Sequence, residues 1–142
     1  MVDKAVLDQA KAFLCWDAVQ GISVQLVALS GVAAYFYPPD TRQCSIVVFY
    51  NNEEADCSGA LYYLFHEAGH AVQFQMMKSS GTSGDFRRLM NIYKGEERVA
   101  FEAESWQLGR SLLEQFIQKQ ELNQSLLAEY DQLAAESLQT YS

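Results

Sequence analysis

Strand-forming residues are concentrated in one block of the chain, residues 22–50, and helical patterns flank this block on both sides. The block holds three runs rich in β-branched and aromatic side chains, separated by Ser30-Gly31 and by PPDTRQ: ISVQLVAL, GVAAYFY and CSIVVFY. Before the block, apolar residues recur at helical spacing over residues 2–19. This order predicts an α+β fold with a small antiparallel meander as its sheet.

The rest of the chain predicts helices joined by loops. A helix is expected over 57–78, a loop over 79–95 with a short helical segment near 86–93, a long helix over 96–119 and a last amphipathic helix over 121–140. The loop contains SSGTSG, the one stretch rich in glycine and serine. No internal repeat is visible, so residues 1–142 are expected to form a single domain.

Composition limits the kinds of partner that we expect this protein to bind and the cellular compartment in which we expect it. The net charge of −8 and a pI near 4.6 argue against a nucleic-acid or anionic-membrane surface, because phosphate groups would be repelled. Cys15, Cys44 and Cys57 are odd in number and widely spaced, which favours free thiols over a disulfide framework. With no leader visible at the N-terminus, we expect a cytoplasmic protein.

Both histidines of the chain lie in LFHEAGHAVQ, four residues apart. On a helix, residues four apart lie on one face, so His66 and His70 can offer two nitrogens to one ion, a spacing that suits zinc. Glu67 lies beside them and could take a proton from metal-bound water, then pass it to a leaving amine. Gly69 and its neighbour Ala68 are small, so we expect neither to crowd the ion. The alternative is that both histidines are core residues.

A catalytic zinc site needs a third protein ligand, and no third histidine exists. The helix expected over 96–119 offers several glutamates. Glu102 shares a face with apolar residues such as Val99 and Trp106, where a carboxylate is costly unless it is paired or bound to metal. We therefore choose Glu102, with Glu104 and then Glu97 as alternatives. A plain salt bridge to an arginine, Arg98 or Arg110, would explain the same carboxylate without a metal.

HEAGH followed by EAESW on the next long helix resembles the gluzincin metallopeptidases. The continuation QLGRSLL resembles the small ImmA/IrrE-type metallopeptidases, and the helix and strands that come first are similar to the reduced core of the minigluzincins. The resemblance implies one zinc ion bound by His66, His70 and Glu102, with Glu67 as the catalytic residue of a peptidase. In the ImmA/IrrE-like case it implies cleavage of a partner regulator; in the minigluzincin-like case it implies latency imposed by a terminus.

The chain departs from the gluzincin pattern at two places. Trp106 stands where many members have an acidic or amide residue that orients the first histidine, and the oxyanion-stabilising histidine has no counterpart. Tyr93 is the tyrosine that we consider for the second role. These departures keep open a second hypothesis, a zinc-binding or interaction domain without turnover.

On the substrate side, we expect a peptide to add to an exposed strand edge, with SIVVFYNN as the best candidate for that strand. The loop Ser79–Gly84 could form a lid over the cleft or be a plain connector.

Overall fold

The structure is a computed structural model that describes residues 1–38 and 43–142, and it confirms the α+β class. The predicted PPDTRQ connection falls largely on residues outside the described ones. The elements are α1 (Lys4–Ala12), a π-helical turn η1 (Phe13–Ala18), β1 (Ile22–Leu29), β2 (Ala33–Tyr37), β3 (Cys44–Asn51), α2 (Ser58–Ser79), α3 (Ser83–Met90), α4 (Glu96–Gln120) and α5 (Ser125–Gln139).

The strand order differs from the predicted antiparallel meander. The order is β1-β3-β2, in which β3 pairs in parallel with β1 and antiparallel with β2. The prediction that all three strands pair antiparallel in sequence order is therefore wrong. The central strand is β3, which has the most continuous apolar run. A central strand is covered on both edges, and β3 exposes little of either face.

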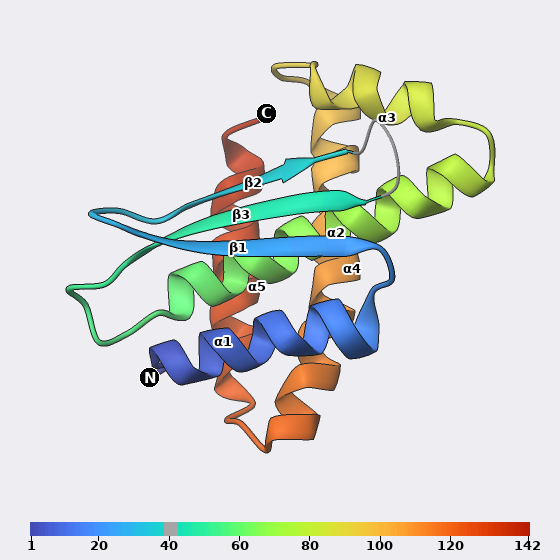
Figure 1. Cartoon of the computed structure of the whole chain (residues 1–142). Coiled ribbons are helices and arrows are strands. Elements are labelled where there is room, and N and C mark those ends of the chain that lie inside the picture. Colours follow the sequence, from blue (N-terminus) through green and yellow to red (C-terminus); the bar gives the residue numbers. More distant parts are fainter. Residues whose placement is uncertain (39–42) are drawn as a thin grey trace.

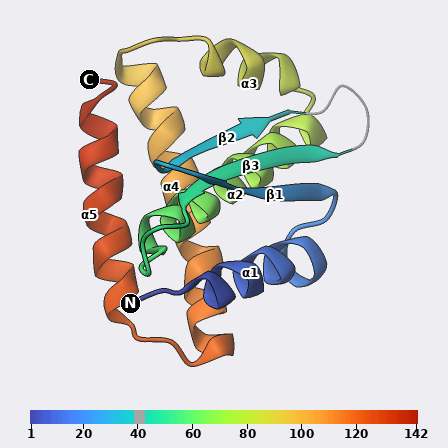
Figure 2. The ribbon, with the colours of Figure 1, turned by 60° about the vertical axis from the view of Figure 1, so that its left-hand side comes forward.

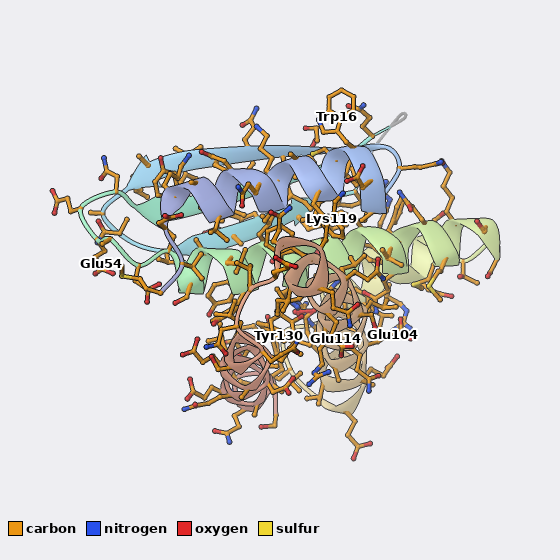
Figure 3. All side chains as sticks on the ribbon, turned by 90° about the horizontal axis from the view of Figure 1, so that it is seen from below. Trp16, Glu54, Glu104, Glu114, Lys119 and Tyr130 are labelled. Atoms are coloured by element: carbon orange, nitrogen blue, oxygen red, sulfur yellow. The ribbon has the colours of Figure 1, made fainter. Side chains whose placement is uncertain are left out.

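The elements form layers, with the sheet on one side, α2 against it, and α4 with α5 behind α2 (Figure 1; Figure 2). Alternate residues of β3 turn Cys44, Ile46 and Val48 toward this interior. α1 and its π-helical turn lie beside β1 and α2, and Figure 3 shows α4 and α5 nearly end-on below them. α2 is thus sandwiched between sheet and helices, which explains why it is buried around most of its circumference.

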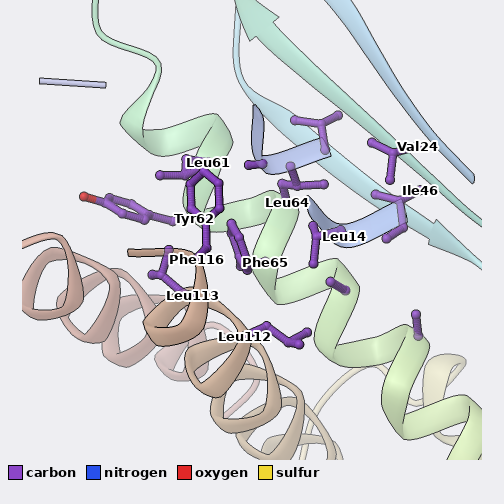
Figure 4. Packing of buried hydrophobic residues seen from close by; sticks show 14 of the residues in the cluster. Leu14, Val24, Ile46, Leu61, Tyr62, Leu64, Phe65, Leu112, Leu113 and Phe116 are labelled. Carbon is purple, nitrogen blue, oxygen red and sulfur yellow. The ribbon is translucent and has the colours of Figure 1, made fainter. Parts of the chain in front are cut away.

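The core joins the three layers through side chains of α2 (Figure 4). Leu64 lies toward Leu14 and the strand residues, whereas Phe65 packs against Phe116 of α4 with ring centroids 5.6 Å apart. The cysteines are free, as predicted, and two of them are buried with the apolar residues. Packing on both sides fixes the rotation of α2 about its axis.

Two glycines let α2 and α4 cross in backbone contact. A Cβ atom added to Gly69 would lie 2.0 Å from the Ser105 carbonyl oxygen, and one added to Gly109 would lie 2.3 Å from the Phe65 carbonyl oxygen. No side chain fits at either place. Gly69 therefore serves the close helix crossing, a role that its small size in the sequence did not indicate.

Replacement of Gly69 by alanine should destabilise the protein by about 3 kcal/mol or more, because the added methyl group meets backbone that cannot move alone. The free energy of unfolding in urea measures the effect. Gly59→Ala, near the start of the same helix, is the matched control. Its Cβ would meet nothing closer than 3.9 Å, so it should be neutral or slightly stabilising. Equal stability of the two variants would contradict the close crossing.

Candidate metal centre

Three side chains from α2 and α4 converge where these helices cross. His66 and His70 lie one turn apart on α2, and Glu102 faces them from α4. Their potential ligand atoms all lie within 4.8 Å of one another. All three residues are buried, with exposed fractions of 5%, 2% and 2%. This buried group of two imidazoles and one carboxylate could hold a metal ion.

The glutamate in this group is the one chosen from the apolar face of the helix. Glu97 is exposed and contacts Arg88 instead, with 3.1 Å between Arg88 Nη2 and Glu97 Oε2. Glu104 is also exposed and lies outside the group. Arg98 does approach Glu102, but its Nη2 stays 3.7 Å from Oε1, longer than a hydrogen bond. Of the three glutamates considered as the third ligand, Glu102 is therefore the one whose position on α4 places it beside the histidines.

The contacts of Glu102 suit an ion shared by the three side chains. Its Oε2 lies 2.8 Å from His70 Nε2, and its Oε1 lies 3.6 Å from His66 Nε2. Despite that proximity, Oε2 has no aligned hydrogen-bond partner among the described residues. A buried carboxylate oxygen without a bonded donor is costly, and a cation between these atoms would satisfy it. The two nitrogens and the oxygen are also the donor types that zinc takes in catalytic sites.

Without an ion, the electrostatics of the group are those of an ion pair. Burial raises the pKa of Glu102, but contact with His66 and His70 outweighs burial and holds that pKa well below its usual range. Burial lowers the pKa of His70, whereas contact with Glu102 raises it more, so the net change is upward. A metal ion needs neutral imidazole nitrogens as ligands, so metal binding would compete with protonation of His70.

His70 is oriented by Gln73, one turn along α2. The Gln73 amide nitrogen donates to the Phe101 carbonyl at 3.0 Å and to Glu104 Oε1 at 2.8 Å. Its Oε1 therefore faces His70 Nδ1, 2.9 Å away, and accepts the proton there. This bond leaves Nε2 to face Glu102, the arrangement expected of a metal-ligating histidine. Gln73 was missed in the sequence, although its spacing of three from His70 was a usable signal.

His66 is held differently, by a ring and by its backbone. Its imidazole stacks on the Trp106 indole, with centroids 4.0 Å apart and planes 18° from parallel. Ser105 Oγ donates to the His66 carbonyl at 2.8 Å. His66 Nδ1 is buried and has no hydrogen-bond partner among the described residues. Neither contact could be inferred from the helical pattern, because both depend on how α4 docks.

Glu67 reaches the same space without joining the group. It is 8% exposed and lines the cavity next to both histidines. Burial raises the pKa of its carboxyl, since desolvation penalises the charged form, while the neighbouring imidazoles oppose that rise. A raised pKa makes the carboxylate a stronger base, which suits a group that takes up a proton.

A cavity of about 480 Å³ gives access to these residues. One wall is β2, an edge strand of the described sheet, and another carries Tyr141 from the end of the chain. The expected substrate-binding strand SIVVFYNN is β3, which is central and paired on both sides, so that prediction is wrong. Met90 lines the cavity, whereas the loop Ser79–Gly84 does not.

Tyr93, considered for the oxyanion role, also lies away from the cavity and is 83% exposed. Tyr141 lies at the cavity instead, with the Arg98 guanidinium 4.7 Å above its ring. Arg98 is fixed in turn, since its Nη1 donates to three carbonyls near the end of α3, those of Leu89, Met90 and Ile92. The Arg98 guanidinium therefore contacts both the end of α3 and the Tyr141 ring, and it lies near Glu102.

Comparisons with known proteins do not assign this chain to a family. No family model matches the chain, and no curated protein or solved structure gave a significant match. Among the described helices, none combines the length and apolar character needed to cross a bilayer. Any functional assignment therefore rests on the residues of the site.

Protein purified without chelator should contain about one zinc ion per chain, and Glu102→Ala should lose most of it. The carboxylate supplies one of three ligands, so its removal leaves two imidazoles on one helix. Glu97→Ala is the matched control on α4, since its exposed side chain lies outside the group. Elemental analysis by mass spectrometry gives the ratio. Equal zinc in both variants, or none in the wild type after reconstitution, would contradict the site.

Gln73→Leu should lower zinc affinity about 10- to 100-fold, because His70 Nδ1 loses the acceptor that fixes its tautomer. Competition with a chromophoric chelator measures the dissociation constant. Gln75→Leu is the control on the same helix, since that side chain bonds to the Gln20 carbonyl, away from the site. An unchanged affinity in Gln73→Leu would show that this hydrogen bond does not orient His70.

Proposed function

We propose that this protein is a zinc-dependent peptidase. The observation that carries the proposal is the presence of a fourth buried polar group, the Glu67 carboxylate, in the cavity lined by His66, His70 and Glu102. A purely structural zinc site has no need of a free carboxylate beside it. The resemblance of HEAGH and EAESW to the gluzincin metallopeptidases supports the same reaction.

The proposed roles follow from where the side chains lie. His66, His70 and Glu102, which also line the cavity, would hold the zinc ion. Bound zinc supplies Lewis acidity, which lowers the pKa of a coordinated water to about 7. Glu67 would accept a proton from the attacking water and later deliver it to the leaving amine. Burial favours the first of these steps, because it raises the pKa of the Glu67 carboxyl and so makes the carboxylate a stronger base.

The substrate proposed for this cavity is an extended peptide segment. The edge strand β2 forms one wall, and its outer edge faces no other strand of the described sheet. Free backbone groups along such an edge can pair with a peptide in strand conformation. The segment would then run past Glu67 with its backbone fixed. A narrow target is proposed because β2, Met90 at the end of α3 and Tyr141 bound the cavity.

Glu67→Gln should abolish peptide cleavage and leave zinc binding intact. Glutamine has nearly the same shape but cannot take up the proton, so the rate should fall about 10²- to 10⁴-fold. A mixture of peptides incubated with zinc-loaded protein and read by mass spectrometry detects cleavage. Metal content, measured on the same samples, shows whether the site survives.

Glu97→Gln provides the control, since that glutamate is exposed and is not among the residues that line the cavity. Zinc binding without cleavage by the wild type would favour the alternative, a zinc-binding or interaction domain without turnover. One observation favours this alternative: His66 Nδ1 has no hydrogen-bond partner among the residues that the structure describes, whereas metal-ligating histidines usually have one there.

A further inference from the structure

We propose that Trp106 is a positioning residue for the metal-binding group, and that its indole ring holds His66 in place of a hydrogen bond. The inference rests on the metal binding proposed above and not on peptidase activity. Its starting point is the different support of the two histidines. His70 has an acceptor at Nδ1, supplied by Gln73, whereas His66 has none among the described residues.

The stacking geometry restricts the freedom of the His66 ring. With the two ring planes only 18° from parallel and their centroids 4.0 Å apart, the indole covers one face of the imidazole. Rotation of the imidazole about its χ2 angle would turn its edge into the indole. The Ser105 hydroxyl meanwhile holds the His66 carbonyl at 2.8 Å. The stack therefore fixes the plane in which His66 Nε2 faces Glu102.

Trp106 can do this only if its own ring is fixed, and the structure supplies the support. The indole is 3% exposed and meets the Tyr130 ring edge-on at 5.1 Å and the Tyr63 ring at 6.1 Å. The Tyr130 hydroxyl donates to the Trp106 carbonyl at 2.7 Å. Tyr130 is itself buried between α4 and α5 (labelled in Figure 3). Helix α5 thus supports His66 through two aromatic rings.

The indole nitrogen of Trp106 indicates that this residue positions His66 by ring stacking and not by a hydrogen bond. Trp106 Nε1 is buried and has no hydrogen-bond partner among the described residues. Indole is a donor only, so it cannot accept the Nδ1 proton of a neutral, metal-ligating His66. The contact between the two rings is therefore made by their faces. A flat aromatic ring should fulfil this role, and an aliphatic side chain of similar burial should not.

The test compares zinc affinity in Trp106→Phe and Trp106→Leu by chelator competition. Phenylalanine keeps a flat ring, so affinity should stay within a few-fold of wild type. Leucine keeps the apolar volume but removes the stack, and affinity should fall about 10- to 100-fold. Trp16→Leu is the control, since Trp16 is 86% exposed. A folded Trp106→Leu variant that binds zinc as tightly as this control would overturn the proposal.

A second measurement uses the wild-type protein, so it tests the stacking of His66 on Trp106 even if the Trp106→Leu variant fails to fold. The chain has only two histidines, so imidazole resonances of the zinc-loaded wild type are readily assigned by NMR. Ring current from a stacked indole should shift the His66 ring protons upfield of those of His70. Unshifted His66 protons would overturn the proposal. Zinc binding without cleavage would defeat only the peptidase, whereas a wild type that binds no zinc would defeat both proposals.

Discussion

The backbone contact between α2 and α4 is the constraint on which the rest of the site depends. Gly69 and Gly109 remove the side chains that would keep the helices at an ordinary distance, where bulkier residues hold helix axes 8–10 Å apart. At this short distance a glutamate, one of the shorter charged side chains, reaches the histidines of the facing helix directly. A wider crossing would leave Glu102 short of them. The glycines are thus part of the site although they carry no chemistry.

The crossing also explains why the two histidines are supported in different ways. His70 lies where α2 offers its own partner, Gln73, within one turn, so its orientation is a local property of the helix. His66 is supported from the facing helix instead, by the Trp106 ring of α4. Its orientation is a property of the docked helices. Loosening α5, which packs behind Trp106, should disturb the His66 side of the group first.

Sequence reasoning succeeded where the physics is local and failed where it is not. Helical spacing alone places His66 over His70, and the apolar stripe of one helix was enough to single out Glu102 from Glu104. Strand order was not recoverable, because an alternating pattern assigns a strand to a sheet without naming its neighbours. For the same reason the edge strand was misplaced. The Trp106 stack required the docking of α4, which no single helix encodes.

The buried charges around the cavity are the strongest physical argument that this group binds a metal ion. Two carboxylates, those of Glu67 and Glu102, are buried together, and the Arg98 guanidinium, 3.7 Å from Glu102, donates hydrogen bonds to carbonyls near the end of α3. Buried carboxylates are costly unless compensated. Burial lowers the pKa of His70, but contact with Glu102 raises it more. A divalent cation would contact all three donor side chains at once, which no single proton can do, and it would displace any proton from the ligating nitrogens.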